Sequence, residues 1–214
     1  MNLDNIKYPC VFLNIGGVSN ITYLDKQNNI PFSFDIGIGN GPLDSVMQNH
    51  FNTSFDENGK ISINGVINYK AIDKILNDPW YKVFPPKSID KHYLNNLLLL
   101  NIAHLKPEDQ AATISMLVSL QLKESLKFFS LSPKSLYISG GGVKNKAIMN
   151  GIFKEYSSIV FSLDDNNWNA DAMEAQAFAY LAVKSLKSLP YTFNKTTGVN
   201  SATSGGVINF PLNN

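Results

Sequence analysis

The stretch SFDIGIGNGPLD, residues 33–44, passes from an apolar run through a glycine-rich bend to a segment with helical spacing. The apolar run carries one carboxylate, Asp35, and the bend contains Gly37, Gly39 and Gly41. Such a run predicts a strand that ends here, because glycines allow a sharp change of direction before a helix. Taken alone, this stretch could be a tight turn and nothing more, so the role of Asp35 depends on what lies on either side of it.

Two further strand-forming runs lie upstream of this stretch. They are joined to each other through Gly16 and Gly17, and to the third run through KQNN, which are both turn sequences. The pattern predicts an antiparallel meander with strands near 10–17, 19–25 and 31–36.

Downstream of the bend the pattern changes to helices, and then strands alternate with helices. The expected helices cover 41–51, 69–78, 107–131, 145–157 and 169–188, and the later strands cover 135–139 and 158–162. The segments 52–65 and 84–93 read as a polar loop and a rigid proline-rich loop. Antiparallel strands followed by strand–helix alternation indicate an α/β protein with a mixed sheet and helices on both faces.

Composition limits the possible functions. The chain has 214 residues, 44% of them hydrophobic, which suits one globular domain with or without a smaller lobe. A net charge of +1 argues against nucleic-acid binding and against a polybasic membrane surface. The longest apolar run, residues 97–100, is too short to span a bilayer. The first ten letters, MNLDNIKYPC, lack the apolar core of a signal peptide.

The basic residues and the cysteine content add two expectations. All 18 basic residues are lysines, so the chain has no guanidinium fork for phosphate. Any phosphate must therefore be held by lysine, backbone N–H groups or a metal. A single cysteine, Cys10, excludes an internal disulfide and fits a reducing cytoplasm.

Two glycine turns are candidates for phosphate contacts. In NIGGVSN, Gly16 and Gly17 would let backbone N–H groups approach a phosphate, or they form an ordinary hairpin turn. In ISGGGVKN, residues 138–145, a strand leads through three glycines into a helix start, which suits a nucleotide or phosphate but also a plain turn. The GxGxxG spacing of a dinucleotide fingerprint is absent.

One acidic pair and the histidines complete the candidate groups. Asp171 and Glu174 are three apart on one expected helix face. They are either functional, or Asp171 complements the helix dipole while Glu174 is a solvated or capping residue. The three histidines show no metal-ligand spacing.

The order of these motifs resembles the anhydro-N-acetylmuramic acid kinase family of the actin-like, sugar-kinase superfamily. The resemblance covers about residues 11–210, through LNIGGVSNIT, FDIGIGNGPLD, FPPKS, DQAAT, ISGGGVKN, DAMEAQAFAYLA and TTGV. It implies a ribonuclease H-like, actin-like ATPase domain over residues 1–188. It also implies a C-terminal tail, residues 189–214, that returns to a first domain.

The resemblance implies an ATP-dependent kinase of peptidoglycan recycling. The family opens and phosphorylates 1,6-anhydro-N-acetylmuramic acid to N-acetylmuramic acid 6-phosphate, using ATP and Mg²⁺. Asp35 matches the base that activates water, and Glu174 matches a glutamate near the reacting sugar. The other matched positions are a phosphate turn at Gly16 and Gly17, an adenosine-side turn at Gly140, Gly141, Gly142 and Asn145, and substrate-loop residues Gly37, Gly39, Asn40 and Asp171.

The chain departs from the family in its loop residues and its length. The family usually has Thr and Pro at the positions of Ile36 and Ile38, and Gly at Ala170. Members are nearly twice as long and begin with a phosphate-loop domain that nothing here matches. We therefore expect a C-terminal half that is inactive alone, with a separate N-terminal half as a partner. The alternatives are a non-catalytic nucleotide-binding remnant, or another actin-like kinase acting on acetate or a simple sugar.

Overall fold

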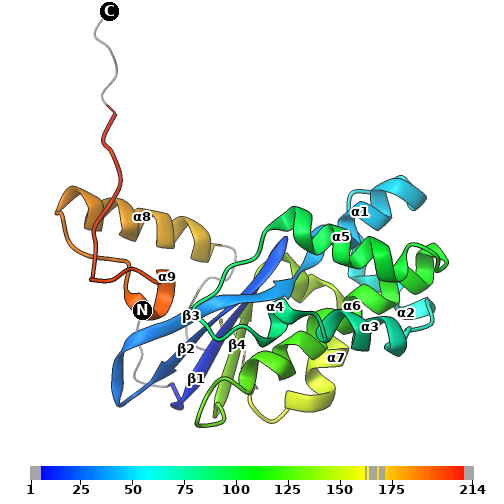
Figure 1. Cartoon of the computed structure of the whole chain (residues 1–214), viewed down its shortest axis with the longest axis horizontal. Coiled ribbons are helices and arrows are strands. Elements are labelled where there is room, and N and C mark those ends of the chain that lie inside the picture. The colour runs from blue at the N-terminus through cyan, green and yellow to red at the C-terminus, as the bar shows by residue number, and fades with distance from the viewer. Residues whose placement is uncertain (1–5, 162, 164–167, 169–171, 210–214) are drawn as a thin grey trace, which may run out of the picture.

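The chain folds around a mixed five-stranded sheet with the strand order β3-β2-β1-β4-β5 (Figure 1). The computed structural model describes residues 6–161, 163, 168 and 172–209. β1 pairs antiparallel with β2 and β2 with β3, whereas β4 lies parallel to β1 and β5 parallel to β4. The strands are β1 Cys10–Ile15, β2 Val18–Asp25, β3 Asn28–Ile38, β4 Ser135–Ser139 and β5 Val160–Phe161. The α/β class and the three-stranded meander are confirmed.

Helices connect and cover these strands. The helices are α1 Asn40–Phe51, α2 Lys60–Asn64, α3 Tyr69–Leu76, α4 Pro79–Lys82, α5 Lys91–Ile102, α6 Pro107–Leu126, α7 Lys146–Tyr156, α8 Met173–Leu186 and α9 Asn194–Thr197. Two 3₁₀ turns, η1 Glu57–Gly59 and η2 Gly141–Lys144, precede α2 and α7.

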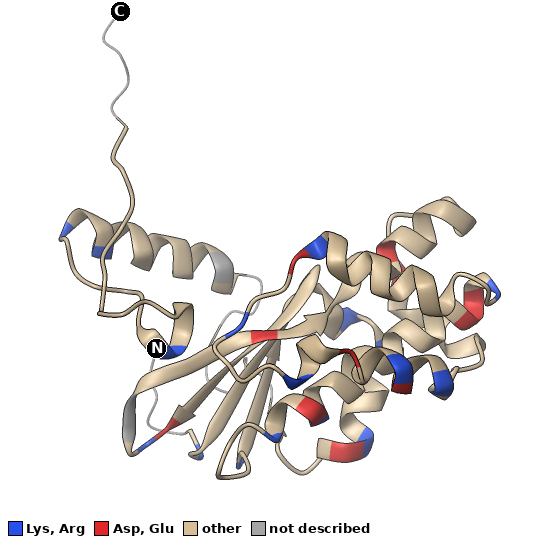
Figure 2. Cartoon of the chain, viewed as in Figure 1, with Lys and Arg blue, Asp and Glu red and all other residues tan. Residues whose placement is uncertain are grey.

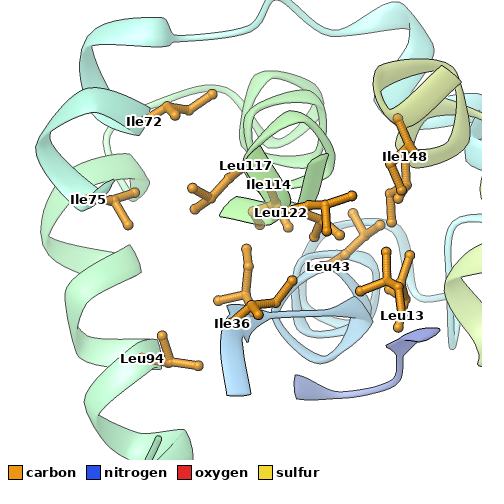
Figure 3. Close-up of a cluster of buried hydrophobic side chains, with 14 of the residues drawn as sticks. Leu13, Ile36, Leu43, Ile72, Ile75, Leu94, Ile114, Leu117, Leu122 and Ile148 are labelled. Carbon is orange, nitrogen blue, oxygen red and sulfur yellow. The ribbon is translucent and has the colours of Figure 1, made fainter. Parts of the chain in front are cut away.

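The main core lies between one face of the sheet and the helices. Alternation along β1 sends Leu13 and Ile15 to this face, where both are fully buried. Figure 3 shows Leu13 and Ile36 from the strands meeting apolar side chains from the helices, among them Leu122 of α6. The long helix α6 is buried along most of its length, so it is the central support of the sheet.

Helix α5 is the main element that the sequence did not predict. Its N-cap, Asp90, accepts hydrogen bonds from the backbone N–H groups of His92 and Tyr93. This cap lies inside the segment expected to be a proline-rich loop, so the rigid part ends at the cap. The expected polar loop at 52–65 likewise contains the short helix α2.

The opposite face of the sheet is less covered. A second apolar cluster lies there, with Cys10, Tyr137 and Trp168 buried in it. Helix α8 begins at this face and then extends away from the sheet, so most of its side chains are exposed (Figure 1). The start of the expected tail folds back, because α9 lies against β3.

Charged residues of both signs are interspersed over helices and loops in Figure 2, in keeping with the net charge of +1. Within the described ranges, the helices are all too short or too polar to cross a bilayer.

Candidate functional site

A cleft of about 1240 Å³ opens on the less covered face of the sheet, at the carboxyl ends of β1 and β4. Open α/β sheets commonly bind ligands at this edge. One part of the cleft is polar and is formed by strand ends and glycine turns. The other part is apolar and includes Met149, Phe153, Val160, Phe161 and Met173. The cleft therefore suits a ligand with one apolar planar end and one strongly polar end.

A row of polar residues crosses the sheet at the mouth of this cleft. The strand register aligns Asp35 with Asn20, Asn20 with Asn14, and Asn14 with Ser139. Directly paired residues share a face of a sheet, so the four side chains stand on one side. Asn14, Asn20 and Ser139 line the cleft, and Asp35 lies beside it on the edge strand β3.

Asp35 is half-buried and held from one side. Its backbone N–H donates to the carbonyl of Lys87 at 3.0 Å, and the N–H of Ile89 donates to its Oδ2 at 3.0 Å. Burial raises the pKa of the Asp35 carboxyl, and the Ile89 hydrogen bond offsets part of this rise. In the described part of the chain, Oδ1 accepts no hydrogen bond. A carboxylate with a raised pKa and an uncommitted oxygen is suited to accept a proton.

The first glycine turn packs against the bend that follows β3. The N–H groups of Gly39 and Asn40 donate to the carbonyls of Gly17 and Gly16, at 3.2 and 2.6 Å. A side chain at Gly39 would collide with the carbonyl oxygen of Gly16, whereas one at Gly17 would meet nothing within 4 Å. Gly16 and Gly17 both line the cleft, so the backbone of this turn can come close to a ligand bound there.

The second glycine turn lies beside the end of β1, next to the first turn, and its three glycines differ in role. Gly140 has φ +85°, and a Cβ there would lie 2.5 Å from the carbonyl oxygen of Ile15. A Cβ at Gly142 would collide with the Ile15 side chain. Gly140 and Gly141 line the cleft, whereas Gly142 is packed beneath it.

Three of the expected site residues, Gly37, Asn145 and Asn40, are not among the residues that line the cleft, although Asn40 contacts both glycine turns. Gly37, with φ +134°, leaves space for Gln121 and Tyr81 in the core rather than for a substrate. Asn145 is buried and caps α7 by accepting from Ala147 and Ile148 N–H groups. Asn40 begins α1, and its amide approaches Gly141.

Two other expected residues cannot be placed. Asp171, like Ala170, lies outside the described residues. Glu174 belongs to the first turn of α8, but its side chain is outside the described part of the structure.

Among the described residues, no group of three or more His, Cys, Asp or Glu side chains is arranged to hold a metal ion. Mg²⁺ in kinases is commonly bound by one or two carboxylates together with substrate phosphates. Asp35 is the described carboxylate in the polar row.

Sequence reasoning missed Asn14, Asn20 and Ser139 as site residues. Asn14 and Asn20 are polar residues at strand positions that alternate with buried ones, which was a readable signal, whereas Ser139 ends a strand that is buried at every preceding position. Their alignment with Asp35 depends on strand register, which a single sequence does not provide. Lys144 also lines the cleft and is the described lysine there, which suits a chain without arginine.

The sequence model of the anhydro-N-acetylmuramic acid kinase family matches residues 3–211. The chain belongs to the anhydro-N-acetylmuramic acid kinase family. The kinase of that name from Methylorubrum extorquens is 36% identical over 203 residues, which is 95% of this chain and 53% of the relative. The kinase from Zymomonas mobilis is 32% identical over 203 residues, covering 95% of this chain and 55% of the relative.

This member of the kinase family is short. It spans about half the length of the curated relatives that it matches. Among solved structures, the activator of the 2-hydroxyisocaproyl-CoA dehydratase from Clostridium difficile, with bound ADPNP, is 18% identical and has a TM-score of 0.48. That match covers 89% of this chain and 68% of the other.

Proposed function

We propose that this chain is the nucleotide- and sugar-binding half of a kinase that opens and phosphorylates 1,6-anhydro-N-acetylmuramic acid. The product would be N-acetylmuramic acid 6-phosphate, in peptidoglycan recycling in the cytoplasm. The observation that carries the proposal is the meeting of the two glycine turns at one cleft, in a chain of this family. Membership of the family also favours this substrate over acetate or a simple sugar.

In this proposal the cleft holds ATP along its length. Its apolar part, with Phe153 and Val160, suits the adenine ring, and the N–H groups of the two turns suit the phosphates. Mg²⁺ would be held by the phosphates and by one carboxylate, and it would neutralise charge on the transferred group. Lys144 supplies a positive charge at the same cleft.

Asp35 acts as the general base in this proposal. It takes a proton from water as the water oxygen attacks C1 of the anhydro sugar. The bond between C1 and O6 breaks, O6 attacks the γ-phosphorus, and ADP leaves. The position of Asp35 beside the cleft, with Oδ1 uncommitted among described groups, supports this role.

We also infer that the half chain has no turnover on its own. Phosphoryl transfer depends on positioning and charge neutralisation, and the relatives are about twice as long. A separate N-terminal half would form the other wall of the cleft, and part of the tail at 189–214 would contact it. The experiment is an ATP-dependent phosphorylation assay on the anhydro sugar, with and without that half.

The second candidate function is a nucleotide-binding protein without catalysis. The half-length of the chain favours it. The same assay separates the two candidates, because a non-catalytic protein would bind nucleotide and yield no phosphorylated sugar when the N-terminal half is supplied.

A further inference from the structure

The segment of residues 87–89 lies along the outer edge of β3. β3 is the edge strand of the sheet, so its outward backbone groups need partners. This segment meets one backbone group and one side-chain group of the same residue: the Lys87 carbonyl accepts from the Asp35 N–H, and the Ile89 N–H donates to Asp35 Oδ2. On its outer side the proposed base is therefore held by a loop, whereas on its inner side it pairs with Asn20 of β2.

The short helix α4 holds this segment in turn. The indole Nε1 of Trp80 donates to the Ser88 carbonyl at 3.0 Å. The ammonium of Lys87 donates to the carbonyls of Trp80 and Tyr81, at 3.0 and 3.2 Å. Three hydrogen bonds thus connect α4 to Lys87 and Ser88, in the segment that contacts Asp35.

The Lys87 ammonium is also packed against two aromatic rings. It lies 4.2 Å from the ring centroid of Trp80 and 5.0 Å from that of Phe128. Among the described residues, no carboxylate lies within ion-pair distance of it. Burial, with a contribution from the nearby Lys82, lowers the pKa of Lys87 to about 8, so the ammonium still predominates at neutral pH. Burying a cation without a carboxylate partner costs free energy of folding. The hydrogen bonds and ring contacts of the Lys87 ammonium instead hold residues 87–89 against α4 and Phe128.

We propose that Lys87 is a positioning residue: with Trp80 it holds residues 87–89 so that the Ile89 N–H fixes Oδ2 of Asp35 and leaves Oδ1 for the reaction. The proposal deepens the proposed function and rests on the assignment of Asp35 as the base. It differs from a purely structural role because it predicts an effect on the Asp35 carboxyl itself.

The first test uses the folded chain and needs no activity. The variants are Lys87→Met, which removes the ammonium, and Trp80→Phe, which removes only the indole donor and leaves every charge in place. Lys82→Met removes a charge from the end of the same helix and is the matched control. Other charged groups nearby, Asp78 and Asp90, stay unchanged in all three.

NMR measures amide hydrogen exchange at Ile89 and the titration of the Asp35 carboxyl carbon. Both test variants should speed exchange at Ile89 by roughly tenfold or more. A tenfold change corresponds to a loss of about 1.4 kcal/mol in the free energy of the local opening that exposes this amide. Both should raise the pKa of Asp35, because the hydrogen bond that favours its charged form is weakened. Lys82→Met should do neither. Unchanged Ile89 exchange and an unchanged Asp35 titration in Trp80→Phe and Lys87→Met would overturn the proposal.

The second test uses the assembled kinase. Lys87→Met should lower kcat while leaving the KM for ATP unchanged, because the nucleotide cleft is not touched. If Asp35→Asn leaves kcat unchanged, the proposed function fails, while the NMR result still decides whether the loop positions the carboxylate. If Lys87→Met leaves kcat unchanged although Asp35→Asn abolishes turnover, the positioning role fails alone.

Discussion

At the scale of single residues, the proposed catalysis depends on Asp35. It is the carboxylate in a row of otherwise neutral polar side chains, and burial raises its pKa. On the same strand, Ile36 and Ile38 are fully buried in the core. Their side chains therefore contribute to core packing and do not line the cleft.

Asp35→Asn should lower kcat of the assembled kinase by roughly 10²–10⁴-fold, because an amide cannot accept the proton. The melting temperature at pH 7 should not fall. The folded-state pKa of Asp35 is raised, so burying its charge opposes folding at neutral pH, and the amide removes that charge while still accepting from Ile89. Asp73→Asn, on the exposed surface of α3, is the control. A lower melting temperature with full turnover would assign Asp35 to the fold only.

Lys87 should leave a signature in the pH dependence of stability. Its folded-state pKa of about 8 lies below its ordinary value of 10.5. Between these values the unfolded chain binds more protons at this site, so the free energy of unfolding gains a rising contribution with pH. Urea denaturation at several pH values from 7 to 10.5 should show wild type gaining stability relative to Lys87→Met. A constant difference over that range would contradict the assigned environment.

At the scale of elements, the three glycines at the start of η2 allow folding and ligand binding to be tested by different substitutions. Gly140→Ala should destabilise the fold by roughly 1–2 kcal/mol or more, because its φ of +85° is left-handed and its Cβ would meet Ile15. Gly142→Ala should also destabilise it through the Ile15 side chain. Thermal denaturation measures both, and wild-type stability in either variant would contradict the packing described for this turn.

Gly141 is the position where a substitution tests the ligand. A Cβ there meets only the Asn40 amide, at 3.1 Å, so a small shift of that side chain accommodates it. Gly141→Val should therefore keep the fold but abolish the weak adenine-nucleotide binding expected of the chain, because the new side chain fills the cleft. Calorimetry with equal ATP binding in wild type and Gly141→Val would refute the nucleotide assignment.

The sequence was sufficient for the elements whose signal is local. Alternation and paired glycines predicted β1, β2 and β3, and the strand-to-glycine change predicted β4 and its turn. It failed for α5, because an apolar LLLL run hides helical periodicity and the Asp90 cap follows prolines. Gly37 was expected to leave room for a substrate, yet Gln121, distant in sequence, occupies that space.

The candidate site was predictable only in part for the same reason. Gly16, Gly17, Gly140 and Gly141 carry their own local signal, and all line the cleft. The polar row with Asn14 and Asn20 depends on strand register. The hydrogen bonds of Lys87 to α4 depend on the packing of the chain around β3. These contacts join residues far apart in the chain, so only the folded structure reveals them.

At the scale of the whole molecule, the cleft is open on one face of the sheet. The described cleft is built from the two glycine turns, the polar row and the start of α8, while the chain spans about half of each relative. Several large apolar side chains on α8, including Phe178 and Leu186, are exposed. This arrangement is what we expect of a domain that binds nucleotide weakly and needs a second domain for chemistry.

The most direct test of the central claim is phosphoryl transfer by a complete cleft. The chain is fused to the N-terminal half of the Methylorubrum extorquens relative, and transfer of labelled phosphate from ATP to 1,6-anhydro-N-acetylmuramic acid is measured. The account predicts N-acetylmuramic acid 6-phosphate from the fusion and none from the chain or the added half separately. A folded fusion that binds ATP but transfers no phosphate to the sugar would contradict it.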